Sequence, residues 1–200
     1  MSQADIFLES EGDNWLDRNR DKLGARDMVA EAIEHLGIKP WRALEIGCTN
    51  GWRLAALQNK YGCIVYGVEP SRQACVEAAV LQVPVFQTSA DALPELGKFD
   101  VVIYGFLLYL CDPADWFRIV AEGDRVLTDG GHLIIQDFPD VSHPFARKYA
   151  HREGVLSYHM RFSDLWQTHP WYQRVYGCGR GLDEYVTVLR KDTKAIPVRP

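Results

Sequence analysis

The residues from Glu45 to Gly51 read Glu-Ile-Gly-Cys-Thr-Asn-Gly and follow a short apolar run. Two glycines around a tight turn let a ligand approach the backbone closely, because neither carries a Cβ. Thr49 stands where the dinucleotide fingerprint G-x-G-x-x-G needs its second glycine. The Glu45 carboxylate would repel a pyrophosphate but would attract an ammonium group. The loop therefore speaks against NAD and against a nucleotide-dependent oxidoreductase.

A second acidic residue, Glu69, follows the next apolar run, within Gly-Val-Glu-Pro-Ser. An acidic side chain that ends the second strand of a nucleotide-binding unit can accept hydrogen bonds from both ribose hydroxyls. Pro70 offers no backbone donor, and Ser71 can cap the helix that follows. Alone, Glu69 could equally be a polar strand end. Together with the glycine loop, it indicates a nucleoside site.

Two further segments offer groups suited to an adenine and to a covered ligand. Asp91, in Ser-Ala-Asp-Ala-Leu-Pro, can accept a hydrogen bond from the exocyclic amine of adenine, although an N-cap of a short turn is the alternative. The stretch from Tyr104 to Tyr109 is aromatic and contains Gly105, which suits it to covering a ligand.

These segments need secondary structure that brings them to one place. Apolar runs predict five strands at residues 43–46, 63–68, 84–87, 99–104 and 132–137. Helical patterns alternate with them, including one that Asp112 would cap and that would carry Leu127 on its apolar face. Continuous apolar strands alternating with helices predict a parallel sheet covered on both faces. Such sheets bind ligands beyond the carboxyl ends of their strands, where the four segments lie.

The four segments, in this order and spacing, resemble class I S-adenosylmethionine-dependent methyltransferases. The resemblance covers residues 40–138 and rests on Glu45/Gly47/Gly51, Glu69, Ala90-Asp91 and Phe99-Asp100. It implies an α/β fold with a Rossmann-like, mostly parallel seven-stranded sheet, helices on both faces and an antiparallel C-terminal hairpin. Apolar runs at 172–178 and 185–190 fit that hairpin.

The resemblance also implies a function and the residues that serve it. The protein would transfer a methyl group from S-adenosylmethionine to an oxygen or nitrogen of a small-molecule acceptor. The alternative is a non-catalytic module that binds S-adenosylmethionine or a partner on the same fold. The residues expected to bind the cofactor are Trp15, Arg18, Glu45, Gly47, Cys48, Gly51, Glu69, Pro70, Ala90, Asp91, Tyr104 and Gly105. Glu69 would hold the ribose, Asp91 the adenine amine, and Tyr104 and Gly105 would pass beside the methionine moiety.

Residues 1–26 form a leader with dense mixed charge, before the main domain at 27–190 and a tail at 191–200. Its segment Gly-Asp-x-Trp-x-x-Arg-Asn, from Gly12 to Asn19, resembles the leader of bacterial methyltransferases encoded near surface-polysaccharide or nonulosonic-acid genes. This resemblance implies a cap over the cofactor, a role for Arg18 as partner of its carboxylate, and a surface sugar as acceptor. The alternative is a solvated leader helix.

Methyl transfer from a sulfonium needs a general base only if the acceptor is a hydroxyl or a protonated amine. The candidate catalytic residues are Tyr109, Asp137 and His143, with His151 and His159 as further candidates. For each histidine, a surface or packing role is the alternative. No metal site is expected, because the spacing of Asp137, Asp140 and His143 in a proline-containing stretch does not form one face.

The segment 138–171 combines arginine, histidine and aromatic side chains without a recognisable element. These side chains could bind an anionic sugar, a nucleotide-linked sugar or an aromatic acid. Trp166 and Trp171 could instead plug the edge of the core.

The composition limits the classes of partner. The chain of 200 residues is 47% hydrophobic and carries a net charge of −5, so it offers no basic surface for nucleic acid or anionic lipid. Five cysteines without C-x-x-C spacing predict reduced thiols. Neither a secretory signal nor a spanning run of ~18 apolar residues is present. We expect a cytoplasmic monomer or homodimer that acts on a small molecule, without nucleic acid or membrane.

Overall fold

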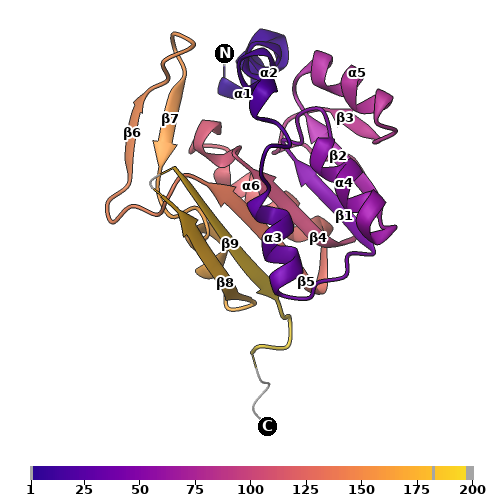
Figure 1. Ribbon diagram of the computed structural model, residues 1–200. Coiled ribbons are helices and arrows are strands. Elements are labelled where there is room, and N and C mark those ends of the chain that lie inside the picture. The colour runs from indigo at the N-terminus through magenta and orange to yellow at the C-terminus, as the bar shows by residue number, and fades with distance from the viewer. Residues whose placement is uncertain (1, 182, 197–200) are drawn as a thin grey trace.

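A computed structural model describes residues 2–181 and 183–196, and its centre is one open, twisted sheet with helices on both faces (Figure 1). The strands are β1 Arg42–Ile46, β2 Ile64–Glu69, β3 Val85–Gln87, β4 Phe99–Gly105, β5 Leu127–Asp137, β6 Phe145–Lys148, β7 Leu156–His159, β8 Tyr172–Arg180 and β9 Glu184–Lys191. The α-helices are α1 Gln3–Ile6, α2 Gly12–Asn19, α3 Met28–His35, α4 Trp52–Tyr61, α5 Arg72–Val80, α6 Trp116–Val126 and α7 Asp164–Gln167. A π-helix, η1 Phe7–Glu11, and two 3-10 helices, η2 Arg20–Lys22 and η3 Leu108–Leu110, complete the described elements.

The sheet has seven strands in the order β3-β2-β1-β4-β5-β9-β8. The first five pair in parallel, and β9 runs antiparallel between β5 and β8. The direction of winding reverses between β1 and β4, where Ile46 lies level with Val68 of β2 and Tyr104 of β4. The loops after these three strands therefore start side by side. The predicted fold class is confirmed.

Alternate residues of the central strands pack into two apolar layers, one on each face of the sheet. Leu44 and Val102 belong to one layer, whereas Ala43 and Val101 belong to the other. All four side chains are fully buried. Burial on both faces explains why these strands read as continuous apolar runs rather than as an alternation of apolar and polar residues.

The predictions for the two ends of α6 are wrong. Leu127 does not lie on the helix but begins β5, opposite Phe99, and the ladder shifts before it resumes at His132. Gly130, with φ of 77°, lies within this irregular stretch. At the other end the N-cap position is Asp115 rather than Asp112, because the Asp112 carboxylate accepts a hydrogen bond from the Gln3 amide at 2.8 Å.

The leader packs against the rest of the molecule instead of standing in solvent. Leu16 is only 1% exposed, and Ile6 is also buried. The Asp13 carboxylate accepts hydrogen bonds from the Ser71 hydroxyl and from the Gln73 amide, the latter at 3.0 Å, at the start of α5. The leader thus fills the N-cap region of a helix that follows the second strand.

The segment 138–171 contains a hairpin, β6–β7, and the short helix α7. The hairpin stands apart from the main sheet, next to the leader at the top of the molecule (Figure 1). Gln3 joins the two, since its side chain donates to Leu110 O at 2.7 Å and accepts from Leu156 N at 2.6 Å. Trp166 is fully buried in the core, in agreement with the alternative that it packs into the edge of the core.

None of the helices in the described ranges is long and apolar enough to cross a membrane.

Candidate functional site

Two adjoining cavities lie at the carboxyl ends of β1, β2 and β4. The lining of the first, here the inner cavity, includes Gln3, Phe7, Gly12, Trp15, Ile46, Gly47, Val68, Glu69, Pro70, Ala90, Asp91, Gly105 and Phe106. The lining of the second, here the outer cavity, includes Trp15, Arg18, Asn19, Glu45, Gly47, Trp52, Arg53, Gly105, Phe106, Tyr109, Gln136, Tyr149, His151 and Glu184. Trp15, Gly47, Thr49, Gly105 and Phe106 line both cavities. A molecule longer than one cavity could therefore extend across this shared wall.

The glycine loop makes a tight turn against β2. The Gly47 and Cys48 amides donate to Val68 O at 2.8 and 3.2 Å. Gly47 has φ of 77°, and a Cβ there would approach the Leu107 side chain to 3.2 Å. Thr49 also has a positive φ, 48°, a conformation that is unfavourable for a β-branched residue. The backbone of this loop thus forms part of the wall of both cavities.

Glu69 presents a buried carboxylate to the inner cavity, and it forms no ion pair with a cation in the part of the chain that the structure describes. It is 6% exposed and accepts hydrogen bonds from Thr49 N at 2.8 Å and Ser71 N at 3.0 Å. Burial raises its pKa to about 7, against the opposing effect of these two amides. A carboxylate has about four acceptor positions, so two more donors, such as vicinal hydroxyls, can still bind.

Glu45 presents a second buried carboxylate, to the outer cavity. One oxygen pairs with Arg53, and the other, Oε2, has no hydrogen-bond partner among the described residues. Burial raises the pKa of Glu45 to about 7, and the Arg53 guanidinium opposes this rise. A buried polar atom without a partner costs free energy. A ligand that donates to Oε2, such as an ammonium group, would remove that cost.

The Arg53 guanidinium is the centre of a polar chain that fixes Glu45. It donates to Asp27 and to Gln136 Oε1, each at 2.9 Å. The Gln136 amide donates in turn to Glu184 at 3.1 Å. The sequence analysis missed Arg53 and Gln136. The signal that could have revealed Gln136 is its polar side chain directly after the apolar run 133–135, in the buried part of β5.

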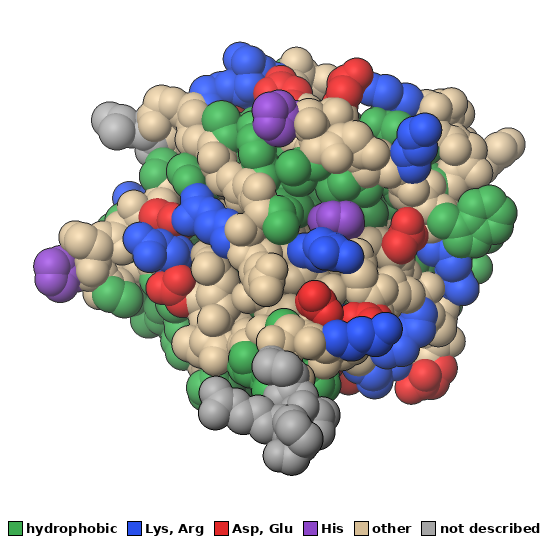
Figure 2. Space-filling model, turned by 90° about the horizontal axis from the view of Figure 1, so that it is seen from below, with side chains coloured by type: hydrophobic (Ala, Val, Ile, Leu, Met, Phe, Trp, Pro, Cys, Tyr) green, Lys and Arg blue, Asp and Glu red, His purple; other side chains and the backbone are tan. Residues whose placement is uncertain are grey.

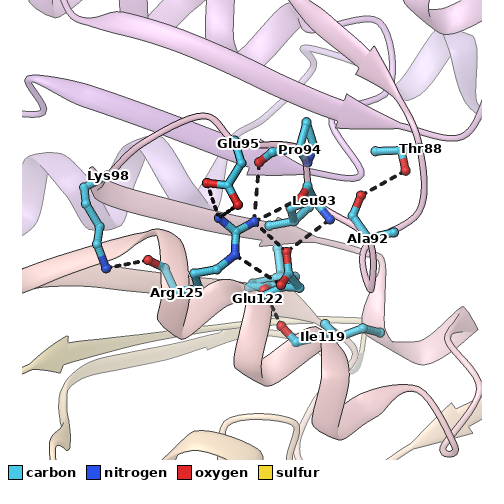
Figure 3. A network of polar contacts seen from close by, with 10 residues as sticks. Thr88, Ala92, Leu93, Pro94, Glu95, Lys98, Ile119, Glu122 and Arg125 are labelled. Atoms are coloured by element: carbon cyan, nitrogen blue, oxygen red, sulfur yellow. Dashed lines mark hydrogen bonds and ion pairs between the residues drawn. The ribbon is translucent and has the colours of Figure 1, made fainter.

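The loop between β3 and β4 carries Ala90 and Asp91 into the wall of the inner cavity. The Asp91 carboxylate accepts from the Ser89 hydroxyl at 2.6 Å and pairs with Arg118 at 3.1 Å. Arg125 of α6 holds the following part of this loop in place through hydrogen bonds and ion pairs (Figure 3). Its guanidinium donates to Leu93 O at 3.0 Å and pairs with Glu122 and Glu95.

The leader contributes residues to the walls of both cavities. Trp15 lines both cavities and donates from Nε1 to the Tyr109 hydroxyl at 3.3 Å. Arg18 lines the outer cavity, where it pairs with the buried Glu11 and donates to the Tyr149 hydroxyl at 3.0 Å. Asn19 also lines the outer cavity and donates to Trp15 O. The three leader residues that the sequence singled out therefore lie at the cavities.

Three of the expected cofactor residues do not line either cavity. Tyr104 is fully buried in the core, where its hydroxyl donates to Ile119 O at 3.3 Å and its ring packs on Trp166. Cys48 is 1% exposed and lies beneath the loop against Gly67. Gly51 occupies the N-cap position of α4 and packs against Val83.

The candidate catalytic residues lie in different places. Tyr109 and His151 line the outer cavity. Asp137 lines a small separate cavity with Asp140 and Thr187, and its carboxylate accepts from Phe138 N at 2.8 Å. His143 is exposed beside Ser142. His159 stacks on Phe145 in the hairpin.

Comparisons with known proteins agree with this architecture. Residues 44–135 match a family described as methyltransferase domain. None of the curated proteins matches the chain in sequence. The 1,6-didemethyltoxoflavin-N1-methyltransferase of Burkholderia thailandensis, solved with 1,6-didemethyltoxoflavin and S-adenosylhomocysteine, shares 18% identity at a TM-score of 0.70, over 96% of this chain and 92% of its own. The N-methyltransferase NodS of Bradyrhizobium japonicum, solved with S-adenosylhomocysteine, shares 17% identity at a TM-score of 0.68, over 96% and 99%.

At these identities the likeness to solved structures shows a common fold. The family match covers the stretch from β1 to β5, which contains the glycine loop, Glu69 and Asp91. The strand order and the reversed β9 agree with both findings. The chain therefore contains a stretch, residues 44–135, that matches a methyltransferase domain, within a fold that it shares with these solved methyltransferases.

Proposed function

We propose that the protein methylates an oxygen or nitrogen atom of a small-molecule acceptor, with S-adenosylmethionine as methyl donor. The observation that carries this proposal is the pair of buried carboxylates at the ends of β1 and β2. Glu45 lines the outer cavity, and its buried Oε2 has no partner among the described residues. Glu69 lines the inner cavity, and none of the described cations forms an ion pair with it. An amino-acid ammonium group and a ribose are the groups that these two carboxylates complement.

The lining residues offer a complementary group to each of three parts of this donor: the ribose, the adenine and the methionine ammonium group. Glu69 would bind the ribose hydroxyls, Ala90 and Asp91 the adenine, and Glu45 the ammonium group of the methionine moiety. The Gly105 backbone belongs to the wall shared by the cavities. When bound, S-adenosylmethionine supplies a methyl group attached to a positively charged sulfur. The positive charge activates this sulfur as a leaving group, because it departs as a neutral thioether.

The chain contributes by positioning the acceptor and by excluding water. Trp15 and Phe106 form the shared wall, so they would shield the place where donor and acceptor meet. The Tyr109 hydroxyl accepts from Trp15 Nε1 and keeps its own proton available for an acceptor atom. Burial raises the pKa of Tyr109, which keeps the phenol protonated near neutral pH. Tyr109 would therefore orient the acceptor as a hydrogen-bond donor.

The identity of the acceptor is the finer part of the proposal. The methyltransferase of similar fold is named for N1 of 1,6-didemethyltoxoflavin and was solved with this compound bound, which supports a small acceptor here. The leader from Gly12 to Asn19 favours a bacterial surface sugar. The competing function is a non-catalytic module that binds S-adenosylmethionine but transfers nothing.

Product formation separates the two functions. Purified protein is incubated with methyl-labelled S-adenosylmethionine and a panel of small hydroxyl compounds, amines and sugars. We expect labelled product together with an equal amount of S-adenosylhomocysteine. Glu69→Gln should abolish most of the turnover at low donor concentration, and Glu34→Gln, which changes an exposed carboxylate on α3, should not. Tight donor binding without any labelled product would favour the non-catalytic module.

A further inference from the structure

Cationic side chains outnumber acidic ones in the lining of the outer cavity. The basic residues are Arg18, Lys22, Arg26, Arg53, Arg147 and Lys148, and the acidic residues are Glu45, Asp183 and Glu184. The molecule as a whole has the opposite balance, with a net charge of −5. On the face seen from below in Figure 2, acidic and basic side chains are interspersed. The cationic excess in the lining of this cavity is therefore opposite to the net charge of the chain.

Half of these cations are neutralised by the fold. Arg18 pairs with Glu11, and Arg26 pairs with Glu31 at 3.3 Å. Arg53 is held between two carboxylates, as described above. These three arginines have structural partners, so their presence needs no ligand to explain it.

Lys22, Arg147 and Lys148 have no carboxylate within ion-pair distance in the described ranges. Among the described residues, the Lys22 ammonium group donates to the Asn19 side-chain oxygen at 3.3 Å and to no other group. Arg147 makes a long contact from Nε to the Ser157 hydroxyl, at 3.4 Å, and its terminal nitrogens have no hydrogen-bond partner within the described part of the chain.

The two signs come from different walls of the cavity. The acidic residues belong to β1 and to the start of β9, on the side of the main sheet. The free cations belong to β6 and to η2 of the leader, and both of these elements contribute to the lining of the cavity. A molecule with one anionic end would therefore be oriented, because its anion is attracted to the hairpin and repelled from the sheet.

We propose that Arg147, Lys148 and Lys22 bind a carboxylate or phosphate group of the methyl acceptor. This inference rests on the proposed function, since it takes the outer cavity as the place of the acceptor. Arginine presents a planar fork of donors that matches either anion, and lysine adds a point charge. The acceptor class is thus an anionic small molecule, such as a sugar acid or a sugar phosphate.

The proposal is tested on protein saturated with S-adenosylhomocysteine. Sodium acetate, sodium phosphate and neutral acetamide are titrated separately at constant ionic strength, and the backbone amide signals of residues 147–151 are followed by NMR. We expect saturable shifts with acetate and phosphate but not with acetamide. The tighter of the two anions identifies the acceptor group as a carboxylate or a phosphate.

Matched variants assign the binding to the hairpin cations. Arg147→Gln should weaken anion binding about fivefold, the size of one solvent-accessible charge pair. Arg152→Gln changes an exposed arginine of the same hairpin that does not line the cavity, and it should leave the affinity unchanged. The affinity for S-adenosylhomocysteine should be the same in both variants.

Three results would overturn the inference while leaving the proposed function intact. They are an equal response to acetamide, equal anion affinities of Arg147→Gln and Arg152→Gln, and loss of S-adenosylhomocysteine binding in Arg147→Gln alone. The last result would assign Arg147 to the cofactor rather than to the acceptor. If the unmodified protein does not bind S-adenosylhomocysteine at all, the proposed function fails first and the inference fails with it.

Discussion

At the scale of single residues, the sequence predicts the carboxylates of the site better than the side chains between them. Glu45 and Glu69 lie at or next to the carboxyl ends of apolar strands, so their place at the cavities follows from the strand pattern alone. Tyr104 also ends an apolar run, but its side chain points to the core, because successive residues of a strand face opposite sides. The next residue, Gly105, lines both cavities. A shift of one residue along the strand decides which residue faces the cavities. The amino-acid composition of the strand does not predict which of the two residues that is.

The exchange Glu69→Gln tests the assignment of the ribose site. It keeps the size of the side chain but removes the charge and replaces one acceptor by a donor. We expect binding of S-adenosylhomocysteine to weaken by ~1–3 kcal/mol, because two hydroxyls lose a charged acceptor. Asp91→Asn should cost less, since water can replace a partly accessible hydrogen bond. Calorimetry gives both values, and unchanged affinity in Glu69→Gln would contradict the assigned site.

Tyr109→Phe tests the positioning of the acceptor. Without its hydroxyl, the ring still fills the wall of the outer cavity, so binding of S-adenosylhomocysteine should stay the same. The turnover number should fall about tenfold, because one hydrogen bond that orients the acceptor is lost. Steady-state kinetics with a panel acceptor measures the effect. Tyr61→Phe, on α4 outside the cavities, is the control, and equal turnover in the two variants would refute the role.

At the scale of elements, the apolar runs of the buried strands made the main sheet predictable, whereas the β6–β7 hairpin was not. All four residues of β6 are exposed, so this strand has neither an apolar run nor an alternation. The leader was recognisable by its charge and its tryptophan, but its docking depends on long-range contacts. Gln3 reaches Leu110 and Leu156, and Asp13 reaches the start of α5. Contacts between distant segments leave no periodic signal in the sequence.

Asp13→Ala tests whether docking of the leader supports the site. The exchange removes an acceptor from the Gln73 amide and the Ser71 hydroxyl, as the loss of a helix cap would. We expect a loss of about 1 kcal/mol in stability. We also expect faster dissociation of S-adenosylhomocysteine, because the leader covers the inner cavity. Thermal unfolding and stopped-flow dissociation measure the two effects. Asp21→Asn, an exposed leader residue, is the control, and identical dissociation rates would contradict a covering role.

At the scale of the whole molecule, buried carboxyl groups link stability to pH. Burial raises the pKa of Glu69 and Asp137 to about 7, whereas these groups titrate near 4.5 and 3.8 when unshifted. Between these limits the folded state binds more protons than the unfolded state. The stability of the ligand-free protein should therefore decrease as the pH rises toward 7.

Ligand binding should follow the opposite trend. An ionised Glu69 is the better acceptor for the ribose, so the increase in Tm caused by S-adenosylhomocysteine should grow from about pH 6 to about pH 8. Thermal unfolding with and without the ligand over this range measures both trends. In Glu69→Gln, the pH dependence of the increase should become flatter. A ligand effect that shrinks as the pH rises would contradict the role of Glu69.

The central claim is that the two adjoining cavities bind S-adenosylmethionine. It is tested most directly by calorimetric titration of the purified protein with S-adenosylmethionine, S-adenosylhomocysteine and NAD in parallel. The structure predicts saturable binding of both sulfur compounds and no binding of NAD, because Glu45 favours an ammonium group and Thr49 replaces a glycine of the dinucleotide loop. Binding of NAD, or of none of the three, would contradict the assigned site.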